Sequence, residues 1–418
     1  MLREMGLKAG LAARKMAMIS TEAKDAALLD LADRIWSERQ KIYDANNTDI
    51  ELGLKAGMSE ALLDRLTLTE KRLIDVAGDL RNVASLPDPI GEHFDEHRLP
   101  NGLFIRKQRV PIGVLGVIYE SRPNVTIDVV GLSLKAGNCV ILRGGSETIN
   151  SNRALVEIIH SALGNHDLPI EAVQFIDNPD RELVTQLLKM HDQIDMLIPR
   201  GGKALHRYCS ENSLIPVITG GLGICHLYVD KAVDQEAVMK IVQNAKVQRP
   251  SVCNALDTLL VHEMIAADFL PALVEYMAPD GVSFRVHENA QTYLSHEKSD
   301  SIQPAGLEDF DQEWLSLVLG IKVVSGIDEA VEHILEHSTF HSDGILTLNE
   351  ELAGRFVAAV DSAVVFVNAS TRFNDGAQMG LGAEVAVSTQ RLHARGPMGL
   401  KELTTYKWVV IGNNHIRE

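Results

Sequence analysis

Cysteine is scarce in this chain, and the few cysteines present are far apart. The four are Cys139, Cys209, Cys225 and Cys253, and no two of them form a CxxC pair. This spacing excludes a zinc site built on thiolates and suits a reducing compartment. We therefore expect a cytoplasmic protein.

Long apolar runs and a surplus of positive charge are also missing. No stretch reaches the roughly 20 apolar residues that cross a bilayer. Residues 1–20 mix charges with alanines, unlike a signal peptide. The formal net charge is −17, whereas nucleic acids and anionic membranes require a basic face. We expect neither a nucleic-acid nor a membrane partner, and an anionic substrate would need local cations or backbone amides.

Several catalytic signatures are absent as well. The chain contains no GxSxG elbow, which counts against a serine hydrolase. It contains no Walker A sequence and no GxGxxG followed by an acidic residue at the usual distance. Composition alone does not exclude a hydrolase that uses a Cys-His-Asn catalytic set.

What is present is an ordinary globular composition of 418 residues, 45% hydrophobic and 23% charged, enough for two or three domains. Residues 1 to about 85 show helical spacing of apolar side chains. From Gly113 onward strands alternate with helices, which predicts a parallel sheet covered on both faces. The expected strands are 114–119, 139–142, 173–176, 196–198, 217–219 and 225–229. A second α/β region follows over 256–368, and strand-like segments 103–110 and 406–411 lie outside the alternation.

Two glycine-rich loops each follow a predicted strand and precede a predicted helix. Glycine allows a phosphate to approach the backbone, and a helix N-terminus with an arginine supplies positive potential. Tight turns without a ligand are the alternative, and the pattern leaves both open. The loop residues are Arg143, Gly144, Gly145, Ser146 and Glu147, and Pro199, Arg200, Gly201 and Gly202.

Cys253 is the candidate nucleophile. It follows Arg249 and Pro250, which end the preceding helix and place the thiol on a short polar loop. A nearby arginine favours the thiolate, the nucleophilic form. The alternative is a small buried apolar residue, which is what most free cysteines are.

Three histidines, His333, His337 and His341, are spaced four apart, as on one face of a helix. Ser338 and Thr339 weaken the helix beyond His337, and no carboxylates accompany the row. A metal site is therefore not favoured.

Four segments carry a family resemblance. They are 119–124 (Tyr-Glu-Ser-Arg-Pro-Asn), 248–255 (Gln-Arg-Pro-Ser-Val-Cys-Asn-Ala), 367–373 (Val-Asn-Ala-Ser-Thr-Arg-Phe) and 392–399 (Leu-His-Ala-Arg-Gly-Pro-Met-Gly). In this order they resemble the aldehyde dehydrogenase superfamily over nearly the whole chain. The resemblance implies an α/β fold with a Rossmann-type cofactor domain, a second α/β catalytic domain and a small β oligomerisation element. The implied boundaries are 1–98 and 113–247 with 375–400 for the cofactor domain, 248–374 for the catalytic domain, and 99–112 with 401–418 for the oligomerisation strands.

The resemblance also implies roles for individual residues. Cys253 would be the nucleophile, and Asn124 would donate to the oxyanion beside the Cys253 amide. The loop at 143–147 would bind the adenosine ribose, the loop at 199–202 the pyrophosphate, and Glu313 the nicotinamide ribose. Substrate anchors are expected among Arg122, Asn254, Ser370 and Thr371.

The implied reaction is an NADP(H)-dependent reduction of an acyl phosphate through a cysteine thioester. Ile218 stands where hydrolytic relatives carry the glutamate that activates water, so the thioester would await phosphate instead. The resemblance further implies a homo-oligomer and an association with the kinase that forms the acyl phosphate. A dehydrogenase for another acyl phosphate or a plain aldehyde, a cysteine hydrolase or acyltransferase without a nicotinamide, and an inactive scaffold are the alternatives.

Overall fold

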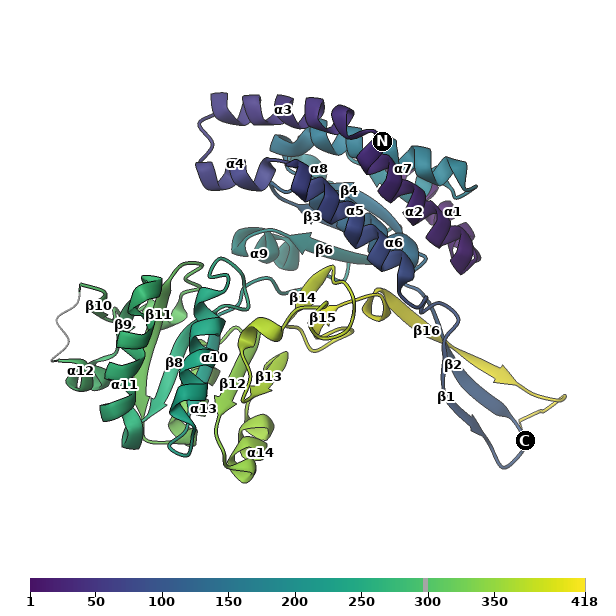
Figure 1. Ribbon diagram of the computed structural model, residues 1–418. Helices are drawn as coiled ribbons and strands as arrows, with labels where there is room; N and C mark the ends of the chain where they lie inside the picture. The colour runs from purple at the N-terminus through teal and green to yellow at the C-terminus, as the bar shows by residue number, and fades with distance from the viewer. Residues whose placement is uncertain (296–299, 418) are drawn as a thin grey trace. The chain divides into compact units, whose positions relative to one another are not determined.

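The computed structural model of the chain describes residues 1–295 and 300–417. It divides into two compact units (Figure 1). Unit 1 comprises Met1–Thr219, Gly380–Ala386 and Met398–Glu418, and unit 2 comprises Gly220–Met379 and Val387–Pro397. None of the described helices is both long and apolar enough to span a membrane.

Unit 1 begins with five helices, as the spacing of apolar residues predicted. Side chains cap two of them, since Ser20 accepts a hydrogen bond from Ala23 N and Thr69 accepts one from Arg72 N. α2 buries Leu28, Leu31 and Ile35, and it packs beside α5. The five are α1 (Leu2–Met16), α2 (Thr21–Ser37), α3 (Arg39–Lys55), α4 (Glu60–Leu66) and α5 (Glu70–Ser85).

A four-stranded parallel sheet follows, in the order β5-β4-β3-β6. Every residue of β3 and β4 is buried, which explains the apolar sequence of β3 and of residues 139–142 of β4. The predicted strand at 217–219 is wrong, because Val217 forms only an isolated bridge with Leu197. The elements are β3 (Val114–Tyr119), α6 (Asn124–Lys135), β4 (Cys139–Arg143), α7 (Ile149–Asn165), β5 (Val173–Phe175), α8 (Glu182–Leu187), β6 (Met196–Arg200) and α9 (Lys203–Asn212).

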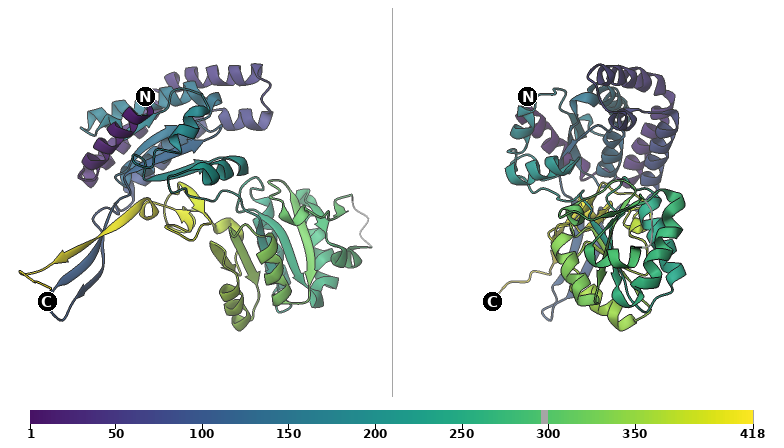
Figure 2. Two further views of the ribbon diagram at one scale, coloured as in Figure 1. Left: turned by 180° about the vertical axis from the view of Figure 1, so that it is seen from behind. Right: turned by 90° about the vertical axis from the view of Figure 1, so that its left-hand side faces the viewer.

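A three-stranded antiparallel sheet, in the order β1-β2-β16, extends from unit 1 away from its helices (Figure 2). It contains β1 (His93–Arg98), β2 (Phe104–Pro111) and β16 (Thr404–Ile411). The two strand-like segments that lie outside the α/β alternation pair with each other, from Phe104 opposite Ile411 to Pro111 opposite Thr404. β2 is therefore the central strand, and only β1 and β16 are edge strands.

Unit 2 is built on a seven-stranded parallel sheet in the order β10-β9-β11-β8-β7-β12-β13. β7, which the sequence grouped with the first α/β region, lies in this sheet between β8 and β12. The strands are β7 (Cys225–Val229), β8 (Leu256–His262), β9 (Ser283–Val286), β10 (Ile302–Pro304), β11 (Val318–Val324), β12 (Ser342–Leu346) and β13 (Val364–Val367). The helices are α10 (Gln235–Val247), α11 (Glu263–Met277), α12 (Glu288–Leu294), α13 (Ile327–His337) and α14 (Glu350–Ala359). β14 (Ala386–Ser388) and β15 (Gly396–Met398) form a separate pair.

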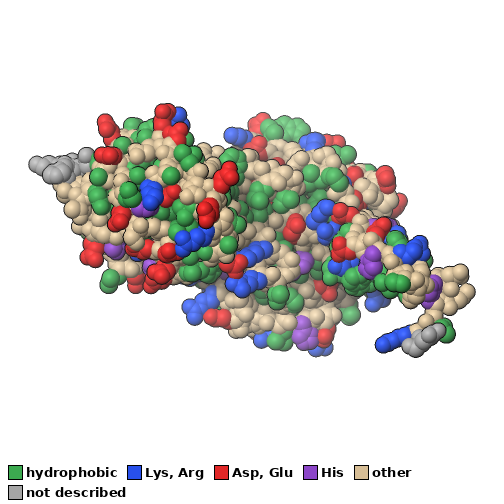
Figure 3. Space-filling view, turned by 90° about the horizontal axis from the view of Figure 1, so that it is seen from below, with side chains coloured by type: hydrophobic (Ala, Val, Ile, Leu, Met, Phe, Trp, Pro, Cys, Tyr) green, Lys and Arg blue, Asp and Glu red, His purple; other side chains and the backbone are tan. Residues whose placement is uncertain are grey.

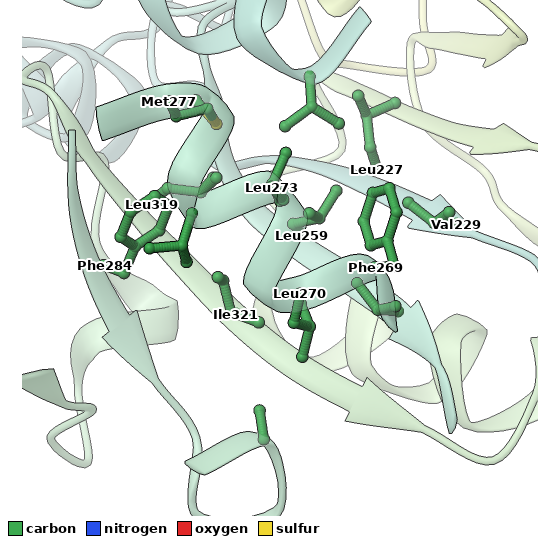
Figure 4. Packing of buried hydrophobic residues seen from close by; sticks show 14 of the residues in the cluster. Leu227, Val229, Leu259, Phe269, Leu270, Leu273, Met277, Phe284, Leu319 and Ile321 are labelled. Carbon is green, nitrogen blue, oxygen red and sulfur yellow. The ribbon is translucent and has the colours of Figure 1, made fainter. Parts of the chain in front are cut away.

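The largest core of unit 2 lies between α11 and the sheet (Figure 4). Phe269, Leu270 and Leu273 project from α11 toward Leu259 of β8 and Ile321 of β11, and all five are fully buried. Replacing Phe269 by alanine would cost about 3–5 kcal/mol of stability, because a cavity would remain.

On the face drawn in Figure 3, basic and acidic side chains are interspersed, and neither sign of charge forms a separate patch.

Candidate active site

The carboxyl ends of three adjacent strands gather the first set of predicted residues in unit 1. β3 lies between β4 and β6, with Ile118 opposite Arg143 and Tyr119 opposite Arg200. The chain runs from β3 to β4 and β5 on one side, whereas β6 lies on the other side of β3. Ligands of parallel sheets bind where the strand order reverses in this way.

The loop at 143–147 is held by its own side chains. Arg143 is buried, donates to the carbonyls of Gly144 and Pro179, and has its pKa lowered by burial. A Cβ on Gly144 would stand 2.3 Å from Asn152 Nδ2, so a larger residue there would displace the buried Asn152 side chain. Glu147 Oε1 accepts hydrogen bonds from the Ser121 amide at 2.8 Å and the Ser121 hydroxyl at 2.7 Å. These bonds join the loops that follow β3 and β4.

The loop at 199–202 leads directly into α9. The Gly202 N–H donates to Glu120 Oε2 at 3.0 Å, and a Cβ on Gly201 would stand 2.4 Å from the same oxygen. A carboxylate at the start of a helix shows that this backbone accepts an anion. Glu120 was not among the predicted site residues, although it lies in the quoted segment 119–124 and directly follows β3.

Asn124 is the first residue of α6, two residues after the exposed Arg122. Its Nδ2 donates to Asp128 Oδ2 at 3.0 Å, one helical turn further on. Burial, reinforced by the charge of Asp79, raises the pKa of Asp128 to about 7. Asp128 was not among the predicted site residues.

Cys253 lies on the turn between α10 and β8 and is partly exposed, as the sequence predicted for this loop. The other three cysteines, all of which the structure describes, are buried. Burial raises the pKa of the Cys139 thiol to about 12, that of Cys209 to about 11, and that of Cys225 well above its ordinary value. The Cys225 thiol donates to the Cys253 carbonyl at 3.2 Å. Among these four thiols Cys253 is therefore the most accessible, and accessibility is one of the conditions for a reactive thiol.

A buried ion pair closes the base of the Cys253 loop. Lys246, near the end of α10, donates to the Leu256 carbonyl at 2.7 Å and to Asp257 Oδ1 at 3.3 Å. Burial lowers the pKa of Lys246 and raises that of Asp257 to about 6. The Trp314 amide also donates to Asp257 Oδ1, at 3.3 Å. No local sequence pattern indicated this pair, because only the fold brings its two members together.

Glu313 is brought to the same region of unit 2. The Gly223 N–H donates to Glu313 Oε1 at 3.0 Å, and Gly223 packs against the backbone of Cys253. With the bond from Trp314 to Asp257, this fixes the Glu313 segment beside the Cys253 loop.

The turn at 370–374 is tied to the Cys253 loop through Asn254. Thr371 Oγ1 donates to the Asn254 carbonyl at 2.7 Å, and Asn254 Nδ2 donates to the Asn374 carbonyl at 3.0 Å. Ser370 Oγ accepts from the Arg372 amide at 3.3 Å. The side chains of Asn254, Ser370 and Thr371 thus make bonds within the protein, and their contact with substrate stays a prediction.

The predicted residues fall into two sets, one in each unit. Asn124, Arg122 and the glycine-rich loops lie in unit 1, and Cys253, Glu313 and the 370–374 turn lie in unit 2.

α13 ends at His337, so His341 lies outside the helix, as Ser338 and Thr339 predicted. Burial and neighbouring cations lower the pKa of His333 to about 2. Among residues 1–295 and 300–417, no cluster of His, Cys, Asp or Glu could hold a metal ion.

Comparison with known proteins gives full-length matches. The aldehyde dehydrogenase family profile matches residues 5–291. The chain is 56% identical over 416 residues to a gamma-glutamyl phosphate reductase of Psychromonas ingrahamii, covering 100% of this chain and 99% of that protein. It is 55% identical over 420 residues to one of Roseiflexus castenholzii, with the same coverage.

Solved structures agree with these matches. The structure of a gamma-glutamyl phosphate reductase from Thermotoga maritima is 44% identical, with a TM-score of 0.97 over 100% of both chains. An acetylating aldehyde dehydrogenase from Geobacillus thermoglucosidasius is 16% identical, with a TM-score of 0.70 over 100% of this chain and 97% of its own, and shows likeness of fold alone. The predicted resemblance, the α/β fold class and the assignment to the oxidoreductases are confirmed.

Proposed function

This chain belongs to the aldehyde dehydrogenase family, and on that premise we propose that it reduces L-glutamyl 5-phosphate to L-glutamate 5-semialdehyde and phosphate with NADPH. The observation that carries the proposal is full-length identity of 53–56% with relatives named for this reaction. The product would cyclise toward proline, so the step belongs to proline biosynthesis. The nicotinamide cofactor follows from the family, and the choice of NADP(H) is part of the proposal.

Cys253 begins the reaction. Its thiolate attacks the acyl carbon of the glutamyl phosphate, a sulfur–carbon bond forms, and the carbon–oxygen bond to phosphate breaks. Phosphate leaves with the electron pair, and a thioester remains. The partial exposure of Cys253 supports this role, because the three other thiols are buried.

Asn124 and the Cys253 amide stabilise the oxyanion that forms when the thioester is reduced. Fixed donors are worth most where negative charge develops. The bond from Asn124 Nδ2 to Asp128 orients the amide and leaves its second hydrogen for the oxyanion. Collapse of the thiohemiacetal then releases the aldehyde and the Cys253 thiolate.

The residues at the carboxyl edge of the unit 1 sheet fit a dinucleotide. Gly201 and Gly202 would receive its pyrophosphate at the start of α9, where the Glu120 carboxylate now accepts from Gly202 N–H. The loop at 143–147 would contact the adenosine ribose, and Glu313 would orient the nicotinamide ribose. When bound, the cofactor supplies the hydride that reduces the thioester.

The side chain of residue 218 determines whether water or phosphate accepts the acyl group. Ile218 is buried and apolar, so it provides no base to activate water. The thioester is therefore consumed by hydride when the acyl phosphate is reduced, and by phosphate when the semialdehyde is oxidised. Arg122, Asn254, Ser370 and Thr371 are proposed to anchor the α-amino and α-carboxyl groups.

The test is reduction of NADP by glutamate semialdehyde with the purified protein, measured with and without phosphate. We expect NADPH formation that requires phosphate and is faster than with NAD. Equal rates without phosphate would instead indicate a plain aldehyde dehydrogenase. Absence of NADPH binding by fluorescence would favour a cysteine hydrolase or acyltransferase.

We also propose a homo-oligomer assembled through the three-stranded sheet. Tyr406 and Trp408 of the edge strand β16 are 47% and 55% exposed, and exposed apolar side chains on an unpaired strand edge mark a surface that can pair with another chain. A monomeric mass in solution at micromolar concentration would contradict this.

Because acyl phosphates are unstable in water, we propose that the protein associates with glutamate 5-kinase. Co-elution of the two proteins tests this association. The four free thiols favour a cytoplasmic location.

A further inference from the structure

We propose that Arg249 and Arg372 form the site that binds the phosphate group of the acyl phosphate beside Cys253. The inference rests on the proposed function and deepens it, because it assigns the residues that select an acyl phosphate over an unactivated acid. From the sequence, Arg249 was expected only to favour the Cys253 thiolate, and Arg372 was not among the predicted site residues.

Arg372 is held in place by neutral groups. Its Nε donates to Gln248 Oε1 at 2.8 Å, and its Nη1 donates to Asn254 Oδ1. Gln248 and Asn254 are both amides, so these bonds fix the guanidinium without neutralising its charge. Within the described part of the chain, Arg372 forms no ion pair and its Nη2 donates no hydrogen bond.

Arg249 adds a second positive charge to the same place. It is exposed, lies four residues before Cys253, and makes no hydrogen bond or ion pair within residues 1–295 and 300–417. Burial and the charge of Arg249 lower the pKa of Arg372, while Asp375, Cys253 and Cys225 act in the opposite direction. An anion that lies between two guanidinium groups relieves their mutual repulsion and accepts hydrogen bonds from both.

The chemistry requires an anion at this position. The phosphate is bonded to the carbon that Cys253 Sγ attacks, so it must lie within a few ångströms of the sulfur. The leaving oxygen gains negative charge as its bond to carbon breaks, and guanidinium N–H groups stabilise that charge. A chain with net charge −17 would otherwise repel a phosphate dianion, so capture needs local cations.

Steady-state kinetics of the variants Arg249→Gln, Arg372→Gln and Arg372→Lys test the inference, in phosphate-dependent oxidation of glutamate semialdehyde. We expect KM for phosphate to rise about tenfold or more in both glutamine variants, and less in Arg372→Lys. KM for the semialdehyde should change little. The matched control is Arg355→Gln on α14, which breaks only an exposed pair with Asp328 and should leave both constants unchanged.

A second readout does not depend on turnover. Inorganic phosphate should slow alkylation of Cys253 in the wild type and not in Arg249→Gln. An unchanged KM for phosphate and unchanged protection in Arg249→Gln would overturn the inference, and this variant removes no bond within the described fold. If the wild type itself shows no phosphate-dependent NADP reduction, the proposed function fails, which is a separate outcome.

Discussion

Gly223 lies so close to Cys253 that a Cβ on the glycine would stand 1.6 Å from the Cys253 carbonyl oxygen. The same glycine donates its N–H to Glu313. The φ angle of Gly223 does not lie in the left-handed region, so glycine is not needed here for its conformational freedom. It is needed because the Cys253 backbone approaches so closely. The absence of a side chain at residue 223 thus allows the Cys253 turn and the Glu313 segment to pack together.

Substituting Gly223→Ala should therefore displace the Cys253 backbone and reduce kcat by about 100-fold or more. The measurement is phosphate-dependent NADP reduction, together with circular dichroism to confirm folding. Gly354→Ala in α14 is the matched control, since no atom lies within 4 Å of its added Cβ. The control should keep full activity and gain about 0.5–1 kcal/mol in stability. A Gly223→Ala enzyme as active as the control would contradict the account.

Lys246→Met should destabilise unit 2 strongly, because it leaves the buried Asp257 carboxylate without its cation. The expected loss is about 3–5 kcal/mol in the free energy of unfolding, measured with urea near neutral pH. Lys240→Met on the same helix breaks an exposed pair with Glu236 and should cost less than about 1 kcal/mol. Equal losses in the two variants would show that the buried pair does not support the Cys253 loop.

Asp128 makes the stability of the folded protein depend on pH. Because its pKa is raised in the folded state, stability falls as the pH rises. Between its unfolded pKa of about 4 and its folded pKa of about 7, the folded state keeps a proton that the unfolded state has lost. This contribution is fully present below the unfolded pKa and is lost as pH rises through the folded pKa.

Asp128→Asn should therefore match the wild type near pH 4 and exceed its unfolding free energy by about 1 kcal/mol or more near pH 8. Urea denaturation of both proteins across this range measures the difference. A difference that does not grow with pH would mean that Asp128 is not protonated in the folded protein near neutrality.

Ile218→Glu should introduce the missing base and raise semialdehyde oxidation without phosphate by about tenfold or more. It should also lower stability, because the carboxylate enters a buried position. Ile218→Gln is the matched control, since it has nearly the same shape and cannot accept the proton. If the two variants oxidise equally slowly without phosphate, the residue at 218 does not choose the acyl acceptor.

Local patterns in the sequence predicted most of the elements. The apolar runs of β3 and β4 and the turn that carries Cys253 could be read directly, because burial and proline chemistry act over a few residues. The strand at Cys225–Val229 was found but assigned to the wrong sheet, because pairing partners in parallel sheets are distant in sequence. The pairing of segments 103–110 and 406–411 within one chain was not predicted for the same reason.

The supporting residues of the site could not be predicted from local patterns. Lys246 and Asp257 resemble ordinary surface charges until the fold buries them together. Arg372 and Glu120 lay within or beside quoted motifs, yet their contacts with Asn254 and Gly202 depend on loops that meet only in three dimensions.

The central claim is that Cys253 forms a thioester that, during oxidation of the semialdehyde, only phosphate releases. The most direct test mixes the wild type and Cys253→Ala with glutamate semialdehyde and NADP in the absence of phosphate. The wild type should form one NADPH per active site in a burst, stop, and resume when phosphate is added, whereas Cys253→Ala should form none. Continuous NADPH formation without phosphate, or a burst from Cys253→Ala, would contradict the claim.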